Sequence, residues 1–361
     1  MQSHSLLAKL ALLPISKAYG MVTAIRNWMF DTHILKETTF PVPIIVVGNL
    51  AVGGTGKTPH VEYIVEHLRG TYNIGVLSRG YKRFTKGFVM ASQFSKPTDI
   101  GDEPYQIYHK FKGEVPVAVC EKRVDGINEL LKANSDINLV ILDDAFQHRY
   151  VKPTVAIVLT EFNRPVYEDS MLPYGRLRES MSQLRRANII VATKCPEKNS
   201  ALDYRLFEEN LKLMACQKLF FSKFTYGHLQ PIFPEAAAKP PMLEWLAEEN
   251  RVLAIAGIGN PKPFVRYLKH FKAKVRVNIY SDHHNFTRKD METIRQRYEG
   301  MDGNRKLLIT TEKDAVRLAN CPYFPPQLKK YAYYLPINVE MMRNEEEAFI
   351  EQIKKVIRQS I

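Results

Sequence analysis

A run of glycines followed by a lysine and a threonine is the strongest chemical signal in this sequence. The stretch reads PIIVVGNLAVGGTGKTP and covers residues 43–59. Glycines let a backbone wrap closely around an anion, so that several N–H groups point toward it. A following lysine can reach the β- and γ-phosphates of a nucleotide, and a threonine hydroxyl can bind Mg²⁺. The stretch predicts a phosphate-binding loop whose contacts come from Gly53, Gly54, Thr55, Gly56, Lys57 and Thr58.

The elements on either side of this loop favour that interpretation over a glycine-rich turn with a chance Lys-Thr pair. Residues 44–47 are β-branched and apolar, as in a strand buried on both faces. After the loop, apolar residues recur with the i, i+3, i+4, i+7 spacing of a helix with one buried face. They are Val61, Ile64, Val65 and Leu68. Strand, loop and helix in this order form a P-loop, although Ala51 stands where the strict pattern has glycine.

Acidic residues follow a second apolar run. Residues 137–142 read INLVIL and lead directly into Asp143 and Asp144. An apolar strand that ends in aspartate downstream of a P-loop is typical of a Walker B element, which holds Mg²⁺. The alternative is a pair of turn-forming aspartates. With Thr58, these two carboxylates make the candidate metal site.

Two further polar stretches leave their role open. Asp102 precedes a helical stretch, so it fits a helix N-terminus as well as a base that takes a proton from an attacking hydroxyl. Residues 172–179 read LPYGRLRE, and Arg178 in them suits either a phosphate contact or an exposed basic loop. Spacing alone does not choose between these alternatives.

The rest of the chain alternates strands and helices. Besides 44–47, we expect strands at 73–78, 115–119, 137–142, 155–159 and 187–192, and then at 252–256, 275–280 and 307–310. This alternation predicts an α/β fold with a doubly wound, mostly parallel sheet of the P-loop NTPase type and a second, smaller α/β domain. We expect the first domain at residues 37–245 and the second at 246–361.

The N-terminal residues 1–36 are set apart by an apolar stripe beside basic residues. The stripe comprises Leu6, Leu7, Leu10, Leu13, Met21, Ile25, Trp28 and Met29. No apolar run is as long as the roughly 20 residues that a membrane-spanning helix needs. The stripe predicts an amphipathic helix that either lies in a membrane interface or packs on the protein's own core. A net charge of +13 favours anionic partners in general, or is simply a solvated basic surface.

Several function classes fit the sequence poorly. The stretch Thr193-Lys194-Cys195-Pro196 lacks the Asn-Lys-x-Asp signature that reads guanine in small GTPases, which leaves ATP as the default nucleotide. No Lys/Arg cluster with interleaved aromatics indicates a nucleic-acid partner. The four cysteines are far apart and form no C-x-x-C pair, which argues against a zinc site or a disulfide framework and fits a reducing compartment.

Eight motifs in a fixed order resemble those of the tetraacyldisaccharide 4′-kinases, the lipid A 4′-kinases of Gram-negative bacteria. They read GNLAVGGTGKTP, VLSRGY, GDEP, LDDAFQHR, LPYGRLRE, AGIGNP, SDHHNFT and TTEKDA. The resemblance runs from the N-terminal helix to about Asp314. It implies transfer of the γ-phosphoryl group of ATP to the 4′-hydroxyl of a tetraacyldisaccharide 1-phosphate, giving lipid IVA. It also implies a peripheral enzyme on the cytoplasmic face of the bacterial inner membrane. No obligate protein partner is evident from the sequence.

The same resemblance implies roles for single residues. Asp102 corresponds to the general base, and His283 would orient it or tune it, with His284 as the alternative. Lys57 acts on the transferred phosphate, Mg²⁺ is bound by Thr58, Asp143 and Asp144, and Arg79, Arg123 and Arg178 are candidates for phosphate contacts. Because Asp102 and His283 belong to different predicted domains, the resemblance requires the domains to close.

A different class of function remains as the alternative. A P-loop accessory ATPase or a metal chaperone would work by nucleotide switching rather than by phosphoryl transfer to a substrate. A metal chaperone would be expected to carry a cysteine or histidine cluster, and His283-His284 is the only such pair in the sequence.

Overall fold

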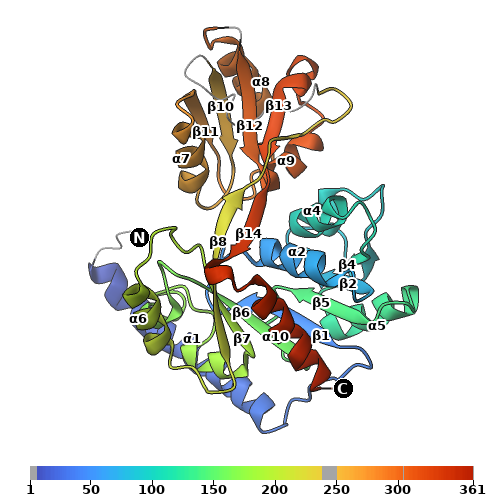
Figure 1. The fold of residues 1–361 in the computed structure, drawn as a ribbon, viewed down its shortest axis with the longest axis vertical. Coiled ribbons are helices and arrows are strands. Elements are labelled where there is room, and N and C mark those ends of the chain that lie inside the picture. Colours follow the sequence, from blue (N-terminus) through green and yellow to red (C-terminus); the bar gives the residue numbers. More distant parts are fainter. Residues whose placement is uncertain (1–5, 238–249, 304, 361) are drawn as a thin grey trace.

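The computed structural model describes residues 6–237, 250–303 and 305–360, with side chains from residue 12 onward. Its elements form two sheets, one above the other in Figure 1. The predicted α/β fold is confirmed, and every predicted strand is present within two residues of its expected limits.

The larger sheet has nine strands in the order β14-β8-β7-β6-β1-β5-β2-β4-β3. All neighbouring pairs in it are parallel except β3 with β4 and β14 with β8. The strands are β1 (Ile44–Asn49), β2 (Ile74–Ser78), β3 (Val89–Met90), β4 (Val117–Val119), β5 (Leu139–Asp143), β6 (Val155–Glu161), β7 (Ile189–Thr193), β8 (Lys218–Tyr226) and β14 (Ile337–Met341). The helices of this part are α1 (Leu6–Asp31), α2 (Lys57–Leu68), α3 (Pro97–Ile100), α4 (Asp102–Lys110), α5 (Arg123–Ala133), α6 (Ala201–Leu211) and α10 (Glu346–Arg358).

The larger sheet is buried on both faces, which explains its continuous apolar strands. Alternate residues of β1 enter different cores: Ile45 and Val47 pack with α2, α4 and α10, whereas Ile44 and Val46 pack with α5 and α6. Because both cores close on β1, the loop that follows this strand starts from a rigid point.

The smaller sheet has five strands in the order β11-β10-β12-β13-β9. They are β9 (Gln230–Pro231), β10 (Arg251–Ala256), β11 (Lys274–Ile279), β12 (Lys306–Thr311) and β13 (Ala332–Leu335). The helices α7 (Lys262–His270), α8 (Arg288–Glu299) and α9 (Glu312–Ala319) pack on it. The antiparallel pair β8 and β14 connects the two sheets (Figure 1).

The division of the chain between the sheets differs from the predicted domain limits. The expected boundary between residues 245 and 246 lies outside the described residues, but β9 at 230–231 already pairs in the smaller sheet. At the other end, β14 and α10 return to the larger sheet. The smaller sheet is therefore an insertion, because the chain leaves along β8 and comes back along β14.

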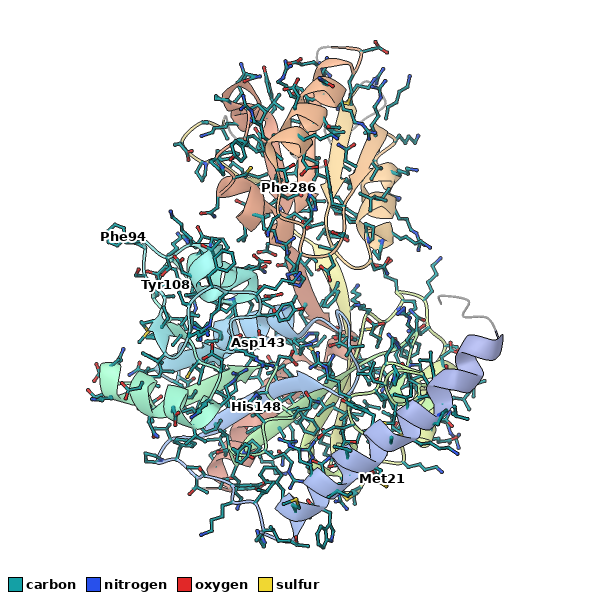
Figure 2. The ribbon with its side chains drawn as sticks, turned by 180° about the vertical axis from the view of Figure 1, so that it is seen from behind. Met21, Phe94, Tyr108, Asp143, His148 and Phe286 are labelled. Atoms are coloured by element: carbon teal, nitrogen blue, oxygen red, sulfur yellow. The ribbon has the colours of Figure 1, made fainter. Side chains whose placement is uncertain are left out.

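The N-terminal helix α1 runs along the outside of the larger domain (Figure 2). Its inner side is fixed by polar contacts: Ser16 Oγ donates to Met171 O at 2.7 Å, and Asn27 Nδ2 donates to Glu179 Oε1 at 3.0 Å. Its outer side exposes apolar side chains, namely Leu13, Ile15, Met21, Val22, Ile25 and Trp28. The predicted stripe is thus exposed at Leu13, Met21, Ile25 and Trp28, while Leu6, Leu7 and Leu10 lie outside the described side chains. Among the described residues, no helix combines the length and the hydropathy that crossing a bilayer requires.

Candidate active site at the junction of the two domains

The predicted phosphate loop lies between β1 and α2, and its shape depends on glycine at position 56. Gly56 has φ of +92°, which is left-handed backbone. A Cβ atom built there would lie 2.2 Å from Cζ of Phe224, on the connecting strand β8. Gly56 therefore allows the loop to turn into the helix and allows β8 to pack against the turn.

Side chains around the loop hold its backbone in place. Asn49 Nδ2 donates to Thr55 Oγ1 at 2.9 Å, and Thr193 Oγ1 donates to the carbonyl of Thr55 at 2.9 Å. The ammonium of Lys194 contacts both the carbonyl of Gly54 and the carboxylate of Glu161. Because the first N–H groups of a helix have no partner within it, the start of α2 offers donors to an anion held by this fixed loop.

The predicted metal-binding residues meet at the first turn of α2. Thr58 Oγ1 lies 3.4 Å from Oδ2 of Asp143, at the end of β5. Lys57 Nζ lies 3.6 Å from Oδ1 of Asp144, and Arg178 Nη1 lies 3.3 Å from the same oxygen. Thus Lys57, Thr58, Asp143 and Asp144, which the sequence assigns to one site, lie together, and Arg178 lies beside them at Asp144.

Asp143 has the environment of a carboxylate that requires a cation. Its Oδ1 is buried and has no hydrogen-bond partner in the described part of the chain. Burial, and next the charge of Asp144, raise the pKa of Asp143 to about 7. The described residues contain no group of three or more His, Cys, Asp or Glu that could hold a metal by itself. A site with one or two carboxylates suits Mg²⁺, which usually keeps waters and binds substrate phosphates as well.

A buried arginine, Arg123, acts electrostatically on Asp143. Arg123 begins α5, donates from Nη1 to Cys120 O at 2.6 Å, and has buried Nε and Nη2 atoms without a partner in the described structure. Burial, and next the charges of Arg123 and Arg79, lower the pKa of His148 to about 4. Figure 2 labels Asp143 and His148 in the central part of the molecule. The unpaired guanidinium donors of Arg123 and the neutral imidazole of His148 suit the binding of an anion.

The second cluster joins the two domains at Asp102. This residue begins α4, directly after Gly101 with its φ of +93°. His283 follows β11 in the smaller domain, and its Nδ1 lies 3.1 Å from Oδ2 of Asp102. Lys313 Nζ lies 2.9 Å from Nε2 of His283. Because an ammonium only donates, Nε2 accepts from Lys313, which leaves the ring proton on Nδ1 for the carboxylate of Asp102. Arg317 Nη2 lies 3.3 Å from the same Nδ1, but its hydrogen bond goes to Oδ2 of Asp102 at 2.7 Å.

The histidine has left-handed backbone, with φ of +59°. Non-glycine residues adopt this conformation uncommonly, and it concentrates at functional sites. The neighbouring His284 points elsewhere: its Nε2 lies 3.0 Å from Oδ2 of Asp290, and its ring stacks on Tyr280. Of the two adjacent histidines, His283 is the one in contact with Asp102.

The sequence interpretation missed two residues of this cluster. Arg317 donates to Oδ2 of Asp102 from Nε at 2.9 Å and from Nη2 at 2.7 Å. Lys313 contacts Glu103 at 3.0 Å besides His283. Both residues lie on α9, four positions apart and therefore on one helix face. The TTEKDA motif contains Lys313 but assigns it no role, and Arg317 lies just beyond the motif.

The two clusters influence each other electrostatically. Glu103, next to Asp102, is close enough to Asp143 to contribute to its raised pKa. Burial by itself would raise the pKa of Asp102, but hydrogen bonds from His283 and Arg317 outweigh it and lower that pKa below its usual value. The site therefore combines a phosphate loop, a buried carboxylate near its lysine, and an ionised carboxylate held from the other domain.

Comparison with known proteins identifies the family. The pattern that defines the family described as tetraacyldisaccharide-1-P 4′-kinase matches residues 8–358. The chain belongs to this family. A relative from Bacteroides thetaiotaomicron named tetraacyldisaccharide 4′-kinase is 42% identical, over 100% of this chain and 96% of its own length. One of the same name from Parabacteroides distasonis is 43% identical, over 98% of this chain and 96% of its own length.

A solved structure extends the agreement to three dimensions. The LpxK of Aquifex aeolicus, crystallised in complex with ATP, is 28% identical and superposes with a TM-score of 0.73, over 97% of this chain and 99% of the other. Membership of the tetraacyldisaccharide-1-P 4′-kinase family bears out the resemblance drawn from the eight motifs. It does not favour the alternative of an accessory ATPase or metal chaperone.

Proposed function

We infer that this chain is an ATP-dependent kinase that phosphorylates the 4′-hydroxyl of tetraacyldisaccharide 1-phosphate in lipid A biosynthesis, forming lipid IVA. Within a chain of this family, the observation that carries the inference is the pairing of a phosphate loop with Asp102 and His283, whose contact measures 3.1 Å. The relatives carry the name of this activity over the full length of the chain.

The reaction follows from what each side chain can do. The loop amides and Lys57 hold the β- and γ-phosphates of ATP. The 4′-oxygen attacks the γ-phosphorus, its proton passes to the carboxylate of Asp102, and the bond between the γ-phosphorus and the oxygen of ADP breaks. Such a transition state needs mainly positioning and neutralised charge, which the cations along the phosphate loop supply.

Mg²⁺ would be held by Thr58 and Asp143, with Asp144 beside them. This assignment rests on the buried Oδ1 of Asp143, which has no partner among the described residues, and on the 3.4 Å contact between Asp143 and Thr58. When bound, Mg²⁺ would neutralise negative charge on the phosphates of ATP. Arg79, which is exposed, the buried Arg123 and the partly exposed Arg178 are the candidates for contacts to substrate or nucleotide phosphate.

Purified protein incubated with γ-labelled ATP and tetraacyldisaccharide 1-phosphate tests this function. We expect label in the lipid fraction and little ATP hydrolysis when the lipid is left out. Label that appears only as inorganic phosphate, whether or not lipid is added, would contradict the kinase and favour a switching ATPase.

We also infer that the enzyme is peripheral on the cytoplasmic face of the inner membrane, where α1 lies in the interface. The outer face of α1 exposes Met21, Val22 and Trp28 to at least 57%, while its inner face is fixed to the protein. An apolar face with basic neighbours binds anionic bilayers by burying its side chains in the headgroup region. Surplus positive charge acts in the same direction.

Charge placed on this face tests the membrane contact. We expect Met21→Glu combined with Trp28→Glu to reduce binding to vesicles that contain anionic lipid by about tenfold or more. Leu202→Glu is the matched control, because Leu202 on α6 is 61% exposed, as Met21 is. Equal sedimentation of both variants with vesicles would contradict the interfacial helix.

A further inference from the structure

The contacts of Asp102 all converge on one of its two carboxylate oxygens. Arg317 Nε and Nη2 reach Oδ2 at 2.9 and 2.7 Å, and His283 Nδ1 reaches the same Oδ2 at 3.1 Å. None of the contacts given for the described residues uses Oδ1. A carboxylate held through one oxygen by three donors cannot turn freely, so its second oxygen has a fixed direction.

Arg317 is itself held rigidly by the smaller domain. Its Nη1 donates to Oδ1 of Asp314 at 3.0 Å and to Gly257 O at 3.3 Å. Asp314 is fully buried, and its Oδ2 accepts the N–H of Gly257 at 2.8 Å and the hydroxyl of Thr311 at 2.6 Å. Two of the smaller domain's motifs, AGIGNP and TTEKDA, therefore have a common structural purpose, which is to aim this guanidinium across the domain junction.

We propose that Arg317 is a positioning residue for phosphoryl transfer: from the smaller domain it fixes Oδ2 of Asp102, so that Oδ1 is the oxygen that takes the proton of the acceptor hydroxyl. This proposal rests on the proposed kinase function. In the step, the O–H bond of the hydroxyl breaks, its proton goes to Oδ1, the oxygen bonds to the γ-phosphorus, and ADP leaves with the electrons of the broken bond. Arg317 changes neither charge nor bonding.

The geometry distinguishes arginine from lysine at this position. A planar guanidinium can contact Asp102 with two nitrogens while the third contacts Asp314, whereas an ammonium acts as one compact charge. Arg317 also helps to keep Asp102 ionised, because its hydrogen bonds and charge lower the pKa of that carboxyl, as those of His283 do. Loss of the guanidinium should then move the acid limb of the pH–rate profile to higher pH.

The test compares the pH–rate profiles of wild type, Arg317→Lys and Arg317→Met. We expect Arg317→Met to lower kcat by up to about 100-fold with the KM for ATP nearly unchanged, because Arg317 makes no contact with the phosphate loop. Arg317→Lys should recover part of the rate, and the acid limb of its pH–rate profile should lie close to the wild-type position. Arg295→Met is the control, since Arg295 forms ion pairs with Glu292 and Glu299 in the same domain and does not touch Asp102.

A second readout does not depend on catalysis. Asp102 can be titrated by ¹³C NMR of protein labelled at aspartate, with Asp102→Asn assigning its signal. We expect Arg317→Met, but not Arg295→Met, to raise the pKa of Asp102. An unchanged titration and an unchanged acid limb in Arg317→Met would overturn the proposal. If wild-type protein transferred no phosphate to lipid, the kinase function would be refuted, and the titration would still decide whether Arg317 controls Asp102.

Discussion

The two ends of the candidate site are built in different ways. The phosphate-loop end comes from one short stretch of chain plus the end of β5, so that Thr58 and Asp143 meet within a single sheet and its helix. The base end joins residues that are far apart in the chain. His283 and Arg317 reach Asp102 from the smaller domain, across separations of 181 and 215 positions. The first end is present whenever the larger domain is folded, whereas the second exists only while the two domains are in contact.

This difference separates binding from chemistry. The supports of the phosphate loop, Asn49, Thr193 and Lys194, all come from the larger domain, so we expect nucleotide binding not to depend on how the domains are arranged. The ionised and oriented state of Asp102 depends on donors from the other domain. Changes at the first end should therefore affect nucleotide binding and rate together, and changes at the second end should affect the rate alone.

The largest effect is expected from Lys57→Met. This change removes the cation that reaches the transferred phosphate, so kcat should fall roughly 100- to 1000-fold and nucleotide binding should weaken as well. Steady-state kinetics and ATP titration measure both effects, with Lys132→Met on the exposed side of α5 as the control. Retained lipid phosphorylation in Lys57→Met would refute the role of the loop.

A change of Asp102 to asparagine should abolish the function of the base end and leave the phosphate-loop end intact. Asp102→Asn keeps the shape of the side chain but removes the base, so kcat should fall by roughly 100-fold or more. Binding of ATP should stay within about twofold, since Asp102 touches none of the loop residues. Asp136→Asn, at an exposed position, is the control. Near wild-type turnover in Asp102→Asn would remove Asp102 from the mechanism.

The same contrast explains how much the sequence could predict. The phosphate loop was predicted because its ligands, its strand and its helix are adjacent in the chain, and local spacing determines them. Asp102 also begins a helix in the structure, so its sequence context fitted a helix start equally well. Its contact with Arg317 depends on how the β8 and β14 connection places the smaller domain, and no local pattern encodes that placement.

The domain limits failed to match the sheets for a related reason. Alternation of strands and helices indicates which elements exist but not which sheet each one joins. β14 and α10 follow the smaller domain in sequence, yet Val339 and Phe349 pack in a core of the larger one. A single antiparallel pairing with β8 decides this, and it links residues more than 100 positions apart.

The pair of adjacent histidines offers a sharper test of the base end. His283→Asn should lower kcat by about tenfold and move the acid limb of the pH–rate profile to higher pH, because the lost hydrogen bond no longer lowers the pKa of Asp102. His284→Asn is the matched control, since His284 contacts Asp290 and is expected to affect stability more than the acid limb. An acid limb that moved with His284 rather than His283 would reverse the assignment of the two residues.

The smallest effect on rate is expected at Glu312, a buried carboxylate of α9 whose pKa depends on charges of the larger domain. Burial, and next the charge of Glu62, raise the pKa of Glu312 to about 7, while Lys110 acts in the opposite direction. A folded-state pKa above the unfolded value means that this group stabilises the fold at low pH and that its contribution is lost as the pH rises from about 4.5 to about 7.

Glu312→Gln should therefore reduce the fall in the free energy of unfolding across this pH window, by on the order of 1–3 kcal/mol. It should change kcat by less than about twofold. Denaturant unfolding at pH 5 and pH 8 measures the difference. Parallel pH dependence in wild type and Glu312→Gln would show that the domain junction tolerates the ionised carboxylate, and the ionic coupling between the domains would then rest on Asp102 with its donors and on the Lys313–Glu103 pair.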